Sequence, residues 1–217
     1  PSAFQNLLFG TDPATASGPG SMKDFYEEVS YGQLTVDGVV DGWVTADNNH
    51  DYYSTPEDAQ ELVKEAVDKA DDQIDFSKYD NNGDGVVDQV AVIHQGRGEE
   101  ESGNSNDIWS HHWQVNYQTS DGVAISGYTI QPERQRTNMA TVGIFAHEFG
   151  HAFGLPDLYD TDYSSEGIGS WGLMAGGSWN YVNRSGDSPA HLCPWSRKFM
   201  GWVSPTKITG EEIHPST

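Results

Sequence analysis

The stretch AHEFGHAFGLPD, residues 146–157, determines how the rest of this chain is interpreted. If its first part is helical, His147 and His151 lie one turn apart and share a helix face. Two neutral imidazole rings in that arrangement can bind a single zinc ion from one side. Glu148 is too close to the first histidine to join the chelate, but it can reach a water molecule bound to the metal. The pattern therefore predicts a zinc site on a helix.

The residues that follow this helix predict a third ligand. Gly154 can adopt the left-handed backbone that ends a helix, and Pro156 favours an extended conformation for the residue before it. The chain therefore turns sharply, and Asp157 can return towards the two histidines. Two histidines, one carboxylate and an open fourth position are the layout of a catalytic zinc site. A helix that carries the motif by chance is the alternative, but the extended pattern is much rarer than the short one.

This set of residues predicts peptide-bond hydrolysis. Zinc lowers the pKa of a bound water from about 16 towards about 7. Glu148 could then take the proton as general base while the water attacks a carbonyl, and later deliver it to the leaving amine. Two alternatives stay open. One is a thermolysin-like peptidase in which Glu166 replaces Asp157 as third ligand, and the other is a calcium-stabilised surface-binding module with a non-catalytic metal site.

Composition and charge narrow the class of protein. The 217 residues are enough for a single domain, and 33 acidic against 11 basic residues give a formal net charge of -22. We do not expect nucleic-acid binding, because this negative charge would repel phosphate groups. Cys193 is the single cysteine, so no internal disulfide can form. We find no apolar run of membrane-spanning length, and the start at Pro1 predicts a processed piece of a longer precursor.

A second informative stretch is DNNGDGVVD, residues 80–88. Oxygen-bearing side chains recur at alternate positions and a glycine permits a sharp turn, as in the first part of an EF-hand calcium loop. The glutamate expected at the end of such a loop is missing, and Ala91 stands there. A plain Asn-Gly or Asp-Gly turn is the alternative. We favour calcium because the alternation exceeds what a turn needs, with ligands from Asp80, Asn82, Asp84, Asp88 and the backbone carbonyl of Val86.

Apolar spacing and turn residues predict the remaining elements. The expected helices cover residues 22–29, a segment from 56 that lies on a sheet, the active-site helix 138–153 and a final helix over 189–201. The expected strands cover 4–9, a hairpin of 33–36 with 39–45, a buried strand over 86–94, and 123–130 as the edge strand that holds substrate. We expect residues 95–106 and His50 to be solvated loop, and one of the pair His111 and His112 to line a cleft.

The pattern His147-Glu148-x-x-His151-x-x-Gly154-x-x-Asp157, with the later Met174, resembles the metzincin-type zinc endopeptidases. More specifically, the chain resembles the immune inhibitor A family of secreted bacterial metalloproteases. The segments that carry this resemblance are 30–32, 80–88, 109–111, 154–157 and 194–202. The resemblance implies a metzincin-like α/β (α+β) domain over residues 1–217 with a twisted mixed sheet. It also implies a substrate cleft between an upper part, about 1–153, and a lower part, about 154–217.

The same resemblance implies roles for residues and for segments outside this sequence. It implies zinc binding by His147, His151 and Asp157, where Asp157 stands in the place of the third histidine of most metzincins. Met174 would form an apolar floor beneath the metal. Many metzincins have a tyrosine just past this methionine, and Tyr181 is the candidate to replace it in stabilising the oxyanion. Secretion to the extracellular space of a bacterium, an inhibitory pro-segment in the precursor and protein or peptide substrates are also implied.

Overall fold

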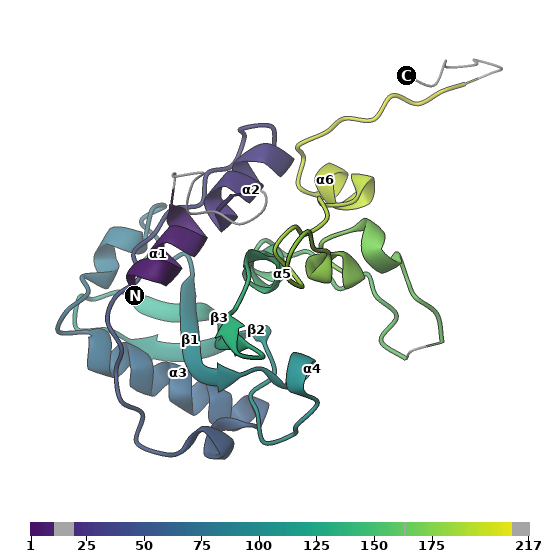
Figure 1. Cartoon of the computed structure of the whole chain (residues 1–217). Helices are drawn as coiled ribbons and strands as arrows, with labels where there is room; N and C mark the ends of the chain where they lie inside the picture. The colour runs from purple at the N-terminus through teal and green to yellow at the C-terminus, as the bar shows by residue number, and fades with distance from the viewer. Residues whose placement is uncertain (11–19, 163, 210–217) are drawn as a thin grey trace.

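A computed structural model describes residues 1–10, 20–162 and 164–209 of the chain. Its centre is a twisted, open, mixed sheet of four strands (Figure 1): β1 (Val90–Arg97), β2 (His111–Gln118), β3 (Ala124–Gln135) and β4 (Asn138–Met139). The order is β1-β3-β2, with β1 parallel and β2 antiparallel to β3, and β4 pairs with the end of β3. This arrangement confirms the predicted α/β (α+β) class.

The prediction that residues 123–130 form an edge strand is wrong. The strand over this segment, β3, lies in the middle of the sheet, and β2 is the edge strand next to it. Residues 128–132 of β3 are all buried, which is the pattern of a strand covered on both faces rather than one with a solvated side. The predicted strand over 86–94 begins later, at Val90, and Val86 forms only an isolated bridge with Ala124.

Two apolar cores lie on opposite faces of the sheet (Figure 1). Helix α3 (Pro56–Ala70) covers one face, and its start is capped by Thr55, which accepts a hydrogen bond from the backbone N–H of Asp58. Helices α1 (Ser2–Phe9), α2 (Met22–Val29) and α5 (Val142–Ala152) pack in the other core. Alternate residues of β1 point into the two cores, as the period of a strand requires.

The first apolar group of the chain is helical, not a strand as predicted. Phe4 and Leu8 are both buried, and their separation of four residues places them on one face of α1. The predicted hairpin over 33–45 is also absent from the described strands. In its place a single extended segment packs on the core, and the side chain of Gln5 bonds to the Gly38 carbonyl (3.1 Å) and the Val40 N–H (2.7 Å). These side-chain bonds satisfy backbone groups that a partner strand would otherwise have paired.

Shorter helical segments complete the described chain. They are η1 (His50–Tyr53), η2 (Phe76–Tyr79), α4 (Glu99–Ser102), η3 (Gly169–Trp171), η4 (Gly176–Trp179) and α6 (Pro194–Phe199). Helix α6 is shorter than the predicted 189–201, because Pro194 occupies its first turn and cannot continue a helix from upstream. The segments after α5, coloured green to yellow in Figure 1, gather on one side of that helix. No described helix combines the length and the apolar character needed to cross a bilayer.

Candidate metal centre and its cleft

Helix α5 positions the two histidines. It begins at Val142, four residues later than predicted, because Asn138 and Met139 pair with β3 as β4 before the chain enters the helix. The helix is buried on most of its surface, between the sheet on one side and the segments that follow it on the other (Figure 1). His147 and His151 lie on the face that borders a cleft, so the predicted sharing of one face is confirmed.

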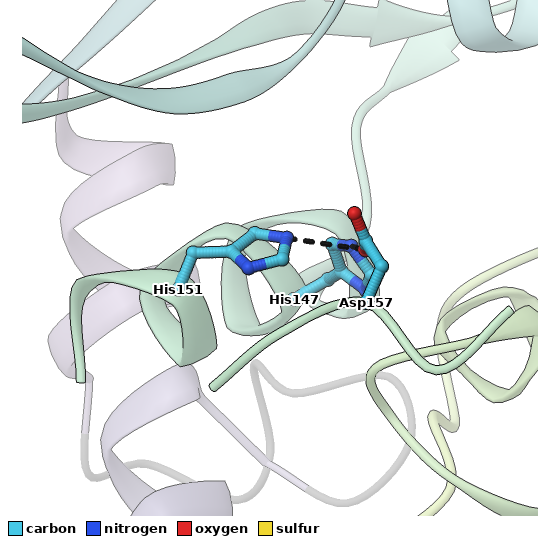
Figure 2. A group of neighbouring side chains, drawn as sticks. All are labelled: His147, His151 and Asp157. Atoms are coloured by element: carbon cyan, nitrogen blue, oxygen red, sulfur yellow. Dashed lines mark ion pairs between the residues drawn. The ribbon is translucent and has the colours of Figure 1, made fainter. Parts of the chain in front are cut away.

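The predicted turn after α5 is also confirmed. Gly154 has a φ of 85°, the left-handed conformation that glycine adopts without strain. Its N–H donates to the His151 carbonyl (2.8 Å), and the Leu155 N–H donates to the Gly150 carbonyl (3.1 Å). These two bonds form a Schellman motif, which reverses the chain. Asp157 therefore returns to the two histidines, and Figure 2 shows its carboxylate beside both rings.

Backbone carbonyls orient the two imidazole rings. Nδ1–H of His147 donates to the Leu173 carbonyl (2.9 Å), and Nδ1–H of His151 donates to the Leu155 carbonyl (2.7 Å). These bonds assign the proton of each neutral ring to Nδ1, which leaves Nε2 with a free lone pair. Nε2 of each ring lies 3.2 Å from Oδ1 of Asp157. Two lone pairs and a carboxylate oxygen therefore face one another.

This convergence suits a cation. Oδ1 of Asp157 is buried and has no hydrogen-bond donor in suitable geometry within the described structure. Burial alone would raise the pKa of Asp157, but hydrogen bonds and charge from His147 and His151, when these rings are protonated and no cation is bound, outweigh burial and hold this pKa well below its usual range. Among the described His, Cys, Asp and Glu side chains, only this trio has ligand atoms that all lie within 4.8 Å of one another. A cation would remove the repulsion between three electron-rich atoms, and the donor set suits zinc.

Glu148 lies beside this trio with a free carboxylate. Its side chain is only 5% exposed, borders the cleft, and makes no hydrogen bond to any described residue. Burial raises the pKa of Glu148 to about 7, although the nearby His147 and His151 act in the opposite direction. A carboxylate with a pKa near neutrality can accept a proton and later return it.

The segment after the helix packs directly on α5. Met174 is 1% exposed, and its Sδ would lie 2.4 Å from a Cβ added at Gly150. The next residue towards the N-terminus, Leu173, supplies the carbonyl that orients His147. Tyr26 also contacts the helix, where its hydroxyl donates to the Ala146 carbonyl (2.6 Å). Met174 therefore contacts the helix between the two histidines, and its backbone neighbour holds one of them.

The cleft has a volume of about 870 Å³ and is bordered by β2, α5 and the segments that follow α5. Sequence reasoning missed Glu100, which borders this cleft although we expected residues 95–106 to be solvated loop. Its carboxylate accepts hydrogen bonds from the N–H (3.1 Å) and the hydroxyl (3.0 Å) of Ser110, at the start of β2. No local signal could have identified Glu100 among three consecutive glutamates, because its partner is ten residues away.

Other predicted residues lie outside the metal trio. Glu166 borders the cleft but does not join the convergent group, and Tyr181 is 70% exposed and lines a hollow that adjoins the cleft. The prediction of a solvated His50 is wrong, because its Nε2 lies 3.2 Å from Nδ1 of the buried His94. Of the histidine pair, we expected one to line the cleft, and both do, although within the described structure only His111 is hydrogen-bonded, to the Trp109 carbonyl and the Tyr128 hydroxyl.

In the loop over residues 80–88 the carboxylates bind backbone N–H groups. Oδ1 of Asp80 accepts from Gly83 (2.8 Å) and Asp84 (3.1 Å), while Oδ1 of Asp84 accepts from Val86 (2.9 Å). The loop carboxylates do not form a convergent group of the kind found at Asp157. Calcium binding by this loop therefore stays a prediction.

Comparison with known proteins gives consistent matches over the chain. Residues 1–203 match the family described as immune inhibitor A peptidase M6, catalytic domain. Immune inhibitor A from Bacillus thuringiensis subsp. alesti is 32% identical over 263 residues, covering 97% of this chain and 37% of that protein. The pre-pro-metalloprotease PrtV from Vibrio cholerae serotype O1 (strain M66-2) is 33% identical over 264 residues, covering 98% of this chain and 28% of that protein. The chain thus spans well under half the length of these relatives.

Proposed function

The chain belongs to the immune inhibitor A peptidase M6 family and corresponds to its catalytic domain, and we propose on this premise that it is a zinc endopeptidase. His147, His151 and Asp157 would hold the metal. The observation that carries the proposal is the convergence of their three ligand atoms beside the free carboxylate of Glu148, within an open cleft.

The proposed chemistry divides between the metal and Glu148. When bound, zinc supplies a Lewis acid that lowers the pKa of water and polarises a carbonyl. Glu148 accepts the proton of the attacking water and then delivers it to the amine that leaves. Burial in the wall of the cleft keeps its carboxylate close to the reacting groups without a competing partner in the described protein.

The decisive test is Glu148→Gln. This change keeps the shape of the side chain but removes the base, so kcat/KM for a casein-derived peptide should fall by about 10²- to 10⁴-fold. Zinc content, measured by elemental analysis, should stay at the wild-type value. Glu57→Gln, at an exposed position on α3, is the matched control. Full activity of the Glu148 variant would contradict the role of base, and a wild-type domain that binds metal without digesting casein would favour the surface-binding alternative.

The identity of the third ligand is tested separately. Asp157→Ala should lose zinc, because it removes the carboxylate that both histidines face, whereas Glu166→Ala should retain it. Zinc affinity can be measured by competition with a chromogenic chelator. The reverse result, loss of zinc in the Glu166 variant alone, would establish the thermolysin-like ligand set instead.

Calcium binding by residues 80–88 is proposed with its own test. The alternating oxygens support it, and a ligand that binds only the folded state raises its stability. Millimolar calcium should raise the melting temperature of the wild-type domain by several degrees but have little effect on Asp84→Ala. Asp51→Ala, which removes an exposed acid elsewhere, should respond like the wild type. An unchanged wild-type melting temperature after calcium-specific chelation would exclude a stabilising calcium site.

The setting of the enzyme is likewise proposed from its relatives. PrtV is named a pre-pro-metalloprotease, and we propose that this domain is also made as a precursor with an inhibitory pro-segment and is secreted by a bacterium. Protein or peptide chains are the proposed substrates. Fractionation of the source cells, with detection of the domain in the medium and measurement of its mass, tests both proposals.

A further inference from the structure

A second pair of histidines, His111 and His112, lies on the edge strand β2 and borders the cleft from opposite faces of that strand. His111 lies opposite Ile130 of β3, and Ile130 belongs to the core that α3 covers. Because successive side chains of a strand point to opposite faces, His112 is on the other face, together with its partner Thr129. Helix α5 contacts β2, and His112 borders the same cleft as His147 and Glu148.

The two rings differ in their hydrogen bonds. Nδ1–H of His111 donates to the Trp109 carbonyl (2.8 Å), and its Nε2 accepts from the hydroxyl of Tyr128 (2.9 Å). Both nitrogens of His111 are therefore in use. The ring of His112 makes no hydrogen bond to a described residue, although it is half-buried. Burial lowers the pKa of His112, and an imidazole ring carries at least one N–H in either protonation state.

The start of β2 is held in place. Both carboxylate oxygens of Glu100 bind Ser110, one through the backbone N–H (3.1 Å) and one through the hydroxyl (3.0 Å). The next two residues pair in register with β3. His112 therefore lies close to the fixed start of the strand, where the pairing with β3 is regular. A donor on such a rigid element can be preorganised for charge that develops during a reaction.

Two of the hydroxyl donors that border the cleft are already engaged. The Ser110 hydroxyl binds Glu100, and the Ser178 hydroxyl binds the Ala175 carbonyl (3.2 Å). Tyr181, which the sequence suggested for this task, is exposed and lines a hollow that adjoins the cleft rather than the cleft itself. No lysine or arginine is among the described residues that line the cleft.

We propose that His112 is a further catalytic residue, whose ring N–H donates a hydrogen bond to the carbonyl oxygen of the scissile peptide bond. The proposal rests on the endopeptidase function proposed above. In the step concerned, the water oxygen forms a bond to the carbonyl carbon and its proton passes to Glu148. The π electron pair of the carbonyl moves onto the oxygen, and the hydrogen bond from His112 stabilises that charge. No oxidant or further reactant is needed.

The kinetic test compares three variants with the wild type. His112→Ala should lower kcat by about 10²- to 10³-fold, the cost of losing one oxyanion donor, with a much smaller change in KM. His112→Gln, which keeps an N–H donor, should recover part of that loss. His191→Gln is the matched control, since His191 is an exposed histidine outside the cleft that pairs with Glu28. Equal activity of His112→Ala and the wild type would overturn the proposal.

A binding measurement separates a catalytic role from a structural one. In a Glu148→Gln background, calorimetry would compare an uncleaved peptide with the phosphinic peptide of the same sequence, which carries a tetrahedral anion. Adding His112→Ala should weaken binding of the phosphinic peptide by about 10²-fold and leave the affinity for the uncleaved peptide unchanged. Equal weakening of both would overturn the proposal in favour of substrate positioning.

The two proposals fail in different ways. A wild-type domain that binds no zinc or cleaves no peptide would overturn the proposed function together with the role of His112. A wild-type domain that is active, with an inactive Glu148→Gln variant and a fully active His112→Ala variant, would leave the proposed function standing and remove His112 alone. Far-ultraviolet circular dichroism confirms that each variant is folded before these results are compared.

Discussion

At the scale of single residues, the close approach of the post-helical segment to α5 depends on missing side chains. Gly143 lies in the first turn of the helix, and a Cβ added there would lie 2.0 Å from the Ser178 carbonyl and 2.9 Å from the Gly186 carbonyl. The N–H of Gly143 also donates to that Gly186 carbonyl (2.9 Å). Both obstructing atoms belong to the backbone, so they cannot move aside as a flexible side chain would.

We therefore expect Gly143→Ala to destabilise the domain. Overpacking of this kind costs about 1–3 kcal/mol, more than the roughly 1 kcal/mol of helix propensity that alanine gains over glycine. The free energy of unfolding in urea measures the difference. Gly42→Ala is the control, because an added Cβ there meets nothing within 4 Å. A Gly143 variant as stable as the control variant would show that the segment packs less closely than described.

At the scale of elements, α4 and β2 are joined by one side chain. Glu100 of α4 is half-buried, and its carboxylate binds Ser110 at the start of β2. Burial raises the pKa of Glu100, although the hydrogen bonds from Ser110 act in the opposite direction. These bonds therefore stabilise a carboxylate that burial disfavours, and they fix the strand that borders the cleft.

Ser110→Ala should loosen this junction. Loss of the hydroxyl leaves one carboxylate oxygen without its partner, at a cost of about 1–3 kcal/mol. Amide hydrogen exchange should accelerate in β2 while the central strand β3 changes less. Ser77→Ala, which removes an exposed hydroxyl bonded to Asp75, serves as the control. Unchanged exchange in β2 would mean that strand pairing alone holds its start.

At the scale of the whole molecule, one buried histidine makes the stability of the folded domain depend on pH. Burial lowers the pKa of His94 to about 4 from an ordinary value near 6.5. Between pH 6.5 and 4 the unfolded chain therefore binds a proton at this position that the folded chain does not, and stability falls as the pH falls through this range. The acidic side chains of the chain, which has a net charge of -22, titrate in a similar range, so the histidine must be isolated by substitution.

Comparison of wild type with His94→Gln isolates this contribution. Relative to the variant, the wild type should lose up to about 3 kcal/mol of unfolding free energy between pH 6.5 and pH 4. Urea unfolding at half-unit pH intervals measures the two slopes. His191→Gln, which removes an exposed histidine, should keep the wild-type slope. Parallel slopes for wild type and His94→Gln would show that His94 titrates normally in the folded state.

The amino-acid sequence by itself determined the local features of this domain. The spacing of His147 and His151, the left-handed turn at Gly154 and the cap at Thr55 all depend on residues within a few positions of one another. The helix periods of α2 and α3 were readable for the same reason. Backbone geometry over such short distances follows from side-chain size, capping and φ preference, without knowledge of the rest of the chain.

Only the tertiary structure decided which strand lies at the edge and which distant groups meet. Periodicity marked β3 as a strand but could not show that β1 and β2 flank it, because strand neighbours are selected by long-range packing. The same limit hid the pairing of Gln5 with an extended segment, and of Glu100 with the start of β2. Contacts of this kind arise when remote segments pack together, and the contact between the Tyr128 hydroxyl and Nε2 of His111 distinguishes that ring from the ring of His112, which has no such bond to a described residue.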